Sequence, residues 1–170
     1  PIFTGGRLNA ARKAAQYSRD AQVQGNRALE EEVVFQVTRA YRTAQLAEAF
    51  QDVAVEAVEL LKAHEHDVAI LVEKGANPEI DLLRTRTELA NARKELNGAN
   101  NAVDLAYSAL KNLLIIPLEK SVHLTEAPVR SPGPEADLSS LTELALSQRP
   151  ELSAIDSQVA AAEQALKAAR

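Results

Sequence analysis

The stretch Leu71–Leu83, which reads LVEKGANPEIDLL, decides the fold because it separates two long helical patterns. Gly75 can adopt the left-handed conformation that closes a helix. Asn77 can cap the next helix with its side-chain oxygen, and Pro78 then takes the first helical position, where its missing N–H costs nothing. We therefore predict a tight turn at residues 75–77 between two antiparallel helices.

The arm before this turn carries a helical pattern without a proline from Arg7 to about Lys74. A helix of that length would measure roughly 100 Å. Gly25 and Asn26 are its weak point and indicate a bend or an irregularity.

Apolar residues of this arm recur at heptad spacing on one side and again on a second flank. Two apolar flanks predict neighbours on two sides, as for a helix within a wall. Gln51 and Glu65 interrupt the first side. The first side holds Val33, Val37, Ala40, Ala44, Ala47, Ala54, Val58, Leu61 and Val68, and the second flank holds Leu46, Val53 and Leu60.

The arm after the turn is more regular. Glu79 and Asp81 place negative charge at its N-terminus, where it stabilises a helix. Large and small residues alternate along a strict heptad seam, and Pro117 forbids continuation beyond about Ile116. The seam holds Leu82, Thr85, Leu89, Ala92, Leu96, Ala99, Val103, Ala106, Leu110 and Leu113. We predict an all-α fold built on a long antiparallel coiled-coil hairpin over residues 1–116.

An irregular connector follows, because prolines recur and periodicity disappears from Pro117 to Pro134. Residues 122–124 could form a short extended piece within it. A short amphipathic helix comes next and begins either at Asp137 or at a capping box from Ser140 to Glu143.

We assign residues 117–148 to this connector with its short helix and residues 149–170 to a further alanine-rich helix. The chain opens at Pro1, not at Met, and ends at Arg170 within a helical pattern. We therefore expect a fragment of a longer protein, with the last helix truncated.

The composition argues against a thick globular core. Aromatic residues make up only 4% of the 170 residues, and Trp, Met and Cys are absent. Alanine supplies much of the apolar content, which favours long, closely spaced helix pairs. The net charge of −5 is mild and both signs are interspersed, so no basic face for nucleic acid accumulates. The sequence contains no apolar run of about 18 residues, so it predicts no membrane-spanning helix.

Residues that could carry chemistry have simpler explanations. His64 and His66 resemble metal ligands, but two residues apart they point to different sides of a helix and cannot share one ion. Acidic residues sit at helix starts or near basic residues, where capping and surface pairing explain them. No nucleophile motif, phosphate-binding loop or dinucleotide fingerprint is present. We expect no enzyme activity, no catalytic residues, no metal site and no cofactor.

The order of these signals resembles the outer membrane efflux proteins of the TolC family, the outer membrane factors of tripartite efflux and type I secretion systems. The matching segments are the entry to a long periplasmic helix (PIFTGGR, 1–7), a mid-helix pattern (Val37, Ala40, Tyr41), the periplasmic tip turn (73–83), the close of the returning helix (110–118) and the opening of a second repeat (145–152). The resemblance covers essentially the whole chain.

The resemblance implies a homotrimer whose subunits build a β-barrel in the outer membrane and an α-helical tunnel, or α-barrel, across the periplasm of a Gram-negative bacterium. The chain would supply tunnel helices of the first repeat, the equatorial connector and the start of the second repeat. Its membrane contact would come only through barrel strands that it lacks. The implied function is passive conduction of substrates that an inner-membrane transporter exports through a periplasmic adaptor protein, with no nucleic-acid partner.

The resemblance also implies that the tip turn narrows the tunnel and meets the adaptor. The candidate adaptor contacts are Gly75, Ala76, Asn77, Pro78 and Asp81. Gly75 would allow a close backbone approach and Asp81 would form a polar or ionic tie, although both also fit simple turn formation. The chain departs from the family where Ala76 and Asn77 replace larger apolar residues. It departs again where Ile115-Ile116 replaces Gly-Leu, and we expect this second departure to matter little.

Two other hypotheses stay open. The helical hairpin of a periplasmic adaptor, or membrane fusion protein, also docks tip to tip with an efflux duct. Adaptors continue into lipoyl-like β segments, however, and residues 117–134 are a poor candidate for these. A coiled-coil scaffold without a transport role would need a third helix along the whole hairpin, and the terminal helix is too short for that.

Overall fold

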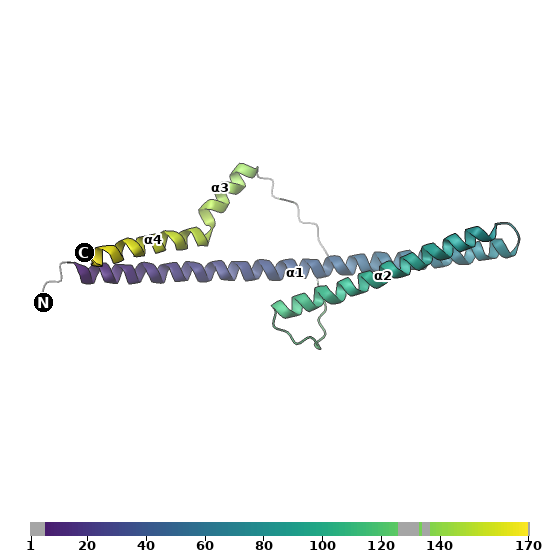
Figure 1. Ribbon diagram of the computed structural model, residues 1–170, viewed down its shortest axis with the longest axis horizontal. Coiled ribbons are helices and arrows are strands. Elements are labelled where there is room, and N and C mark those ends of the chain that lie inside the picture. The colour runs from purple at the N-terminus through teal and green to yellow at the C-terminus, as the bar shows by residue number, and fades with distance from the viewer. Residues whose placement is uncertain (1–5, 126–132, 134–136, 170) are drawn as a thin grey trace. The chain divides into compact units, whose positions relative to one another are not determined.

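The computed structural model describes residues 6–125, 133 and 137–169, and within these it confirms the predicted all-α fold. The described residues form four helices and no strand: α1 (Arg7–Glu73), α2 (Glu79–Leu113), α3 (Leu138–Gln148) and α4 (Pro150–Ala169) (Figure 1). The chain packs as two units. One contains residues 7–35 of α1 with α3 and α4, and the other contains residues 36–73 of α1 with α2 and the segment after it.

α1 is uninterrupted, so the irregularity predicted at Gly25 and Asn26 is wrong. Both residues are helical, and a Cβ added at Gly25 would meet nothing within 4 Å. In the next turn Arg27 Nε pairs with Glu31 Oε1 at 3.0 Å, the spacing that supports a helix. The glycine therefore lowers local helix stability without breaking the helix.

The seam between α1 and α2 follows the predicted heptads and holds two clusters of buried apolar side chains. The tip cluster consists of Val58, Leu89 and Ala92, with Leu61 and Leu96 packed against it. The base cluster consists of Ala44, Ala47 and Ala106, with Val103 and Leu124 packed against it. Alanine dominates both clusters, so the helices approach closely and the core of the hairpin is thin.

The two polar residues that interrupt the α1 heptads face polar partners in α2. Gln51 Nε2 donates to Asn100 Oδ1 at 2.8 Å, and Arg86 Nε donates to Glu65 Oε1 at 2.9 Å. Polar pairs in an apolar seam specify the register, because a shift by one heptad would leave each partner unpaired. The sequence predicted the interruptions but not the partners.

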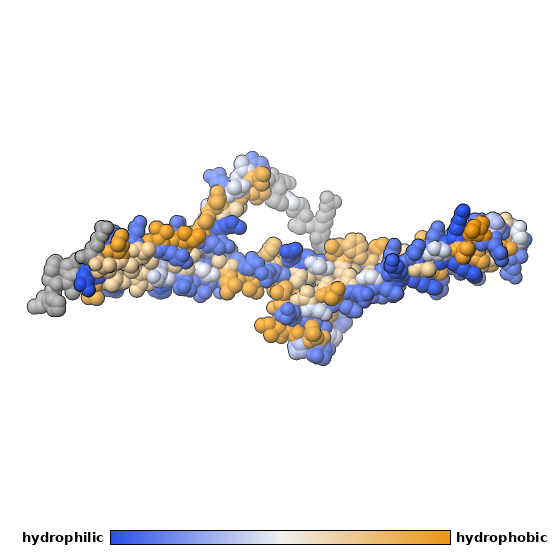
Figure 2. All heavy atoms as spheres, in the orientation of Figure 1, coloured by the Kyte–Doolittle hydropathy of each residue, from blue (hydrophilic) through white to orange (hydrophobic). Residues whose placement is uncertain are grey.

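The second apolar flank of α1 lies on the surface, which we call the outer stripe. Leu46, Val53 and Leu60 are 55%, 63% and 71% exposed, and Phe50 between them is 63% exposed. Figure 2 shows hydrophobic side chains gathered on the outside of the hairpin, away from the seam. Residues at this spacing form one continuous face, and an exposed apolar face of this kind indicates a contact surface.

The segment after α2 folds back onto the base of the hairpin. Leu124 packs against the base cluster. Val122 and Leu124 are half-buried, while His123 between them is exposed. This alternation fits the predicted extended piece, although no strand forms. Nearby the Tyr107 hydroxyl donates to Glu48. Burial, reinforced by this hydrogen bond and the Glu48 charge, raises the pKa of Tyr107 to about 12.

α2 ends at Leu113, and the turn that closes it occupies the next three residues. The N–H of Ile116 donates to Lys111 O at 2.9 Å, and the N–H of Ile115 donates to Asn112 O at 3.2 Å. This pair of bonds requires the first residue after the helix cap to be left-handed, and that residue is usually glycine. Ile115 takes that position with φ 55°, and its side chain is 91% exposed.

The expectation that Ile115 matters little is therefore wrong. A left-handed conformation costs an L-residue about 1–2 kcal/mol, and a β-branched side chain resists it most. Exposure of the side chain leaves this cost without compensation from burial.

Asp137 is the N-cap of α3, which agrees with one of the two predicted starts. The Asp137 carboxylate accepts hydrogen bonds from the hydroxyl and the backbone N–H of Ser140, at 2.6 Å and 2.8 Å, and from the Ser139 hydroxyl at 3.0 Å. These bonds stabilise the ionised form, the Ser140 hydroxyl most, and lower the pKa of Asp137 to about 2. The cap satisfies an N-terminal backbone donor of the helix.

α4 packs through small side chains. Ala154 and Ala161 are buried in α4, and Ala21 is buried in the part of α1 that belongs to the same unit. The larger apolar residues of α4 point elsewhere and are exposed. These are Leu152, Ile155, Val159 and Leu166.

No helix within residues 6–125 and 137–169 combines the length and the apolar character that a bilayer span requires.

Replacing Ile115 with glycine should raise the free energy of unfolding by about 1 kcal/mol, because glycine adopts the left-handed conformation without steric cost. Urea unfolding measures this change. The matched control is Leu114→Gly, because Leu114 is right-handed at φ −86°, and glycine there should instead lower stability by about 1 kcal/mol. A stability for Ile115→Gly equal to or below that of the natural chain would show that Ile115 is not strained.

Candidate functional site

The end of α1 positions the first of the predicted tip residues. The N–H of Gly75 donates to Val72 O and the N–H of Ala76 donates to Leu71 O, both at 2.9 Å. These two bonds satisfy carbonyls at the helix end and require a left-handed residue, which Gly75 supplies with φ 72°. The predicted role of Gly75 in closing the helix is confirmed.

The close backbone approach expected at Gly75 is not found among the described residues of this chain. A Cβ built there would meet no described atom within 4 Å. The backbone conformation alone accounts for glycine in the isolated chain. Any close contact at this position has to come from another molecule or another part of the protein.

The start of α2 differs from the prediction. Pro78, and not Asn77, occupies the N-cap position, with φ −74° and ψ 151°, and no side chain caps the helix. The helix begins at Glu79, one residue later than predicted. Asn77 instead continues the closing turn, with its N–H donating to Leu71 O at 3.3 Å. The proline fixes an extended conformation that starts the helix without a side-chain acceptor.

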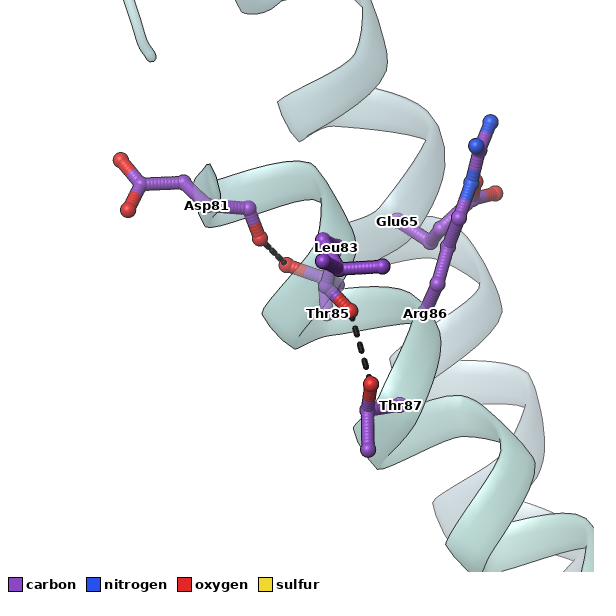
Figure 3. A network of polar contacts seen from close by, with 6 residues as sticks. All are labelled: Glu65, Asp81, Leu83, Thr85, Arg86 and Thr87. Carbon is purple, nitrogen blue, oxygen red and sulfur yellow. Dashed lines mark hydrogen bonds and ion pairs between the residues drawn. The ribbon is translucent and has the colours of Figure 1, made fainter. Parts of the chain in front are cut away.

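Asp81 lies in the first turn of α2, where its charge favours the helix N-terminus, as predicted. Its backbone oxygen accepts a hydrogen bond from the Thr85 hydroxyl at 2.9 Å. The carboxylate itself makes no ion pair or hydrogen bond with the described residues, and Figure 3 shows it pointing away from Glu65 and Arg86. The polar tie expected of Asp81 is therefore not made within the hairpin.

The ion pair nearest the tip is formed by other residues. Arg86 Nε lies 2.9 Å from Glu65 Oε1 and joins the two helices close to the turn (Figure 3). The Glu65 side chain is 24% exposed and that of Arg86 is 61% exposed, so solvent screens the pair and it contributes less than about 1 kcal/mol. The sequence indicated this ion pair only through Glu65, a charged residue at a seam position. Spacing alone could not identify Arg86 as its partner.

A shallow hollow of about 380 Å³ lies beside the turn. It is lined by Glu79, Ile80, Leu82, Leu83 and Arg86. Ile80 is 51% exposed and Leu83 is 61% exposed, so apolar surface faces solvent beside charged groups of both signs. Gly75, Ala76 and Pro78 are also exposed, so the tip presents small and apolar groups to solvent.

The histidines near the tip do not form a metal centre. Within the part of the chain that the structure describes, no three His, Cys, Asp or Glu side chains gather in a ligating arrangement. His64 and His66 are both exposed on α1. The arrangement is that of a hydrogen-bonded turn with an accessible surface.

Comparison with known proteins identifies the kind of protein that carries this hairpin. The family model described as outer membrane efflux protein matches residues 1–114 of the 170. No curated protein matches the sequence.

Among solved structures the chain is similar to CusC, studied for the conformational changes that accompany its folding and transmembrane channel formation. The two share 22% sequence identity with a TM-score of 0.78, over 96% of this chain and 39% of the CusC chain. This likeness shows the fold. The family match favours the efflux-protein hypothesis over the adaptor and scaffold hypotheses.

Replacing Gly75 with alanine should lower the free energy of unfolding by about 1 kcal/mol, because alanine pays the left-handed cost that glycine avoids. Gly75→Asn is the matched control and should lose less than half as much, since asparagine tolerates this conformation. Thermal or urea unfolding of the two variants gives the comparison. Equal losses in both variants would mean that side-chain volume, and not φ, selects glycine here.

Proposed function

We propose that this chain, which belongs to the outer membrane efflux protein family, forms part of the wall of a tunnel that crosses the periplasm and conducts substrates passively. The observation that carries this proposal is the outer stripe of α1. A hairpin that worked alone would present a polar surface on the side away from its seam. This hairpin instead presents Leu46, Phe50, Val53 and Leu60.

The position of the outer stripe fits a wall. At about 100° per residue, its centre lies roughly 120° around α1 from the centre of the seam with α2. A helix with two separate apolar faces is suited to stand between two neighbours in a curved wall. Glu56 and Glu59 lie on the face between them and are exposed, so one side of the wall stays in contact with water.

The arrangement of the longer protein follows from this role. Residues 1–116 serve as a tunnel hairpin, residues 117–148 as an equatorial connector, and residues 149–170 as the start of the helix of a second repeat. Neighbouring hairpins, from the same subunit and from two further subunits of a homotrimer, cover the outer stripe. The wall does no chemistry, and the energy for export comes from an inner-membrane transporter.

The tip turn is the proposed contact with a periplasmic adaptor protein. Gly75, Ala76 and Pro78 are exposed, and the Asp81 carboxylate has no partner among the described residues of the hairpin. The hollow beside Ile80 and Leu83 offers apolar surface next to these groups. A helical hairpin of an adaptor with apolar and basic side chains at its own tip would complement this surface.

Site-specific photo-crosslinking tests the adaptor contact in the longer protein, in cells that make its partners. A photoreactive residue in place of Ala76 should yield an adduct with a protein whose sequence contains the helical hairpin and lipoyl-like segments of an adaptor. The matched control is Asn101, which is exposed on α2 away from the tip and should give no such adduct. Absence of the adduct at Ala76, or equal yield at Asn101, would contradict docking at the tip while leaving the wall role to be judged separately.

A further inference from the structure

The middle of α2 contains the poorest helix-forming sequence in the hairpin. Residues 97–101 read Asn-Gly-Ala-Asn-Asn, although every one of them is helical. Glycine is the weakest helix former after proline, and asparagine ranks among the weaker ordinary residues. Residues 92–96 before it read Ala-Arg-Lys-Glu-Leu and residues 102–106 after it read Ala-Val-Asp-Leu-Ala, so glycine and asparagine are confined to the segment between them.

The apolar core of the hairpin is divided at the same level. The tip cluster ends at Leu96 on α2 and the base cluster begins at Val103. Between them the seam is closed by the 2.8 Å hydrogen bond from Gln51 to Asn100, and the neighbouring Ala99 is only half-buried. The two clusters are therefore held together here by one polar contact in place of interlocking apolar side chains.

Space is available for movement at this level. A Cβ added at Gly98 would meet nothing within 4 Å, so no packing requires glycine there. Its φ is not in the left-handed region either, because only Gly6 and Gly75 of the described glycines have positive φ. Neither a close contact nor the backbone conformation requires glycine at position 98. A glycine in a helix interior lowers the stability of the helix.

The opposite helix has a different character. Residues 47–54 of α1 read Ala-Glu-Ala-Phe-Gln-Asp-Val-Ala and contain no glycine or asparagine. When a pair of packed helices bends, the helix on the inside of the bend must shorten its path or slide. A segment that can lose a backbone hydrogen bond absorbs this change, while the stronger helix stays intact.

We propose that residues 97–101 form a hinge in α2, about which the tip half of the hairpin bends while α1 stays helical. The tip half carries the tip cluster and the Glu65–Arg86 pair and moves as one piece. The hinge is a property of this chain whether or not it lines a tunnel. Its use, which rests on the proposed function, is to let the tip turn shift without unfolding the base of the hairpin.

Amide hydrogen exchange on the chain tests the hinge directly. The amides of residues 97–101 should exchange about tenfold or more faster than those of the flanking seam turns at residues 89–93 and 103–107, because local opening governs their protection. Gly98→Ala should slow exchange in this segment about fivefold, the factor that corresponds to the difference in helix propensity. Even protection along α2, or no response to Gly98→Ala, would overturn the proposal.

Gly25→Ala is the matched control. Gly25 is also an exposed helical glycine with nothing within 4 Å of an added Cβ, but it lies in α1. The substitution adds the same helix propensity and should leave exchange at residues 97–101 unchanged. A general slowing in both variants would mean that global stability, and not a local hinge, sets the exchange rates, and would count against the proposal.

Spin-label distances provide a readout of bending. Labels at the exposed residues Glu88 and Ser108 span the hinge along α2, about 30 Å apart. Their distance distribution should be broad and should narrow in Gly98→Ala. Labels at Thr43 and Lys62 span the same level of α1 and should give a narrow distribution in both proteins. Equal widths for the two pairs would exclude a hinge in α2, and this outcome would say nothing against the wall role.

Discussion

The structure depends on one packing constraint: α1 carries apolar side chains on two sides, and α2 covers only one of them. The seam that α2 fills is rich in alanine and buries few large side chains, and Leu110 is the most deeply buried large side chain among the described residues. Such a thin core contributes little stabilisation, because apolar burial scales with the area removed from water. The outer stripe leaves four large apolar side chains of α1 exposed to water, and a neighbouring protein surface would cover them under the proposed function.

Within the hairpin, polar contacts and not apolar ones define how the helices are aligned. Alanine layers are nearly equivalent to one another, so a shift of α2 along α1 by one heptad would cost little in packing. Gln51 with Asn100 and Glu65 with Arg86 make the layers distinct. The same two pairs divide the hairpin into a base, a middle and a tip. Residues 97–101, where α2 has its lowest helix propensity, lie at the division made by Gln51 and Asn100.

Much of this architecture could be predicted because helical periodicity is a local property of the sequence. The heptads predicted which residues of α1 and of α2 line the seam, and the glycine and proline near residue 75 predicted the turn. The cap of α2 was misassigned because an asparagine before a proline offers two possible starts, and only backbone geometry distinguishes them. The partner of Glu65 could not be predicted, since it depends on the register across the seam. The left-handed conformation of Ile115 was missed because isoleucine gives no signal for the position that glycine normally takes.

Under the proposed function the outer stripe is covered in the assembled protein, and thiol accessibility measures this most directly. Val53→Cys lies on the stripe and Glu56→Cys lies on the charged face beside it, and both positions are exposed in the hairpin by itself. In the assembled longer protein, a water-soluble thiol reagent should label Val53→Cys about tenfold or more slowly than Glu56→Cys, and the difference should vanish on denaturation. Equal labelling rates in the assembled protein would contradict the claim, because they would show the stripe in contact with water and the hairpin standing without a lateral neighbour.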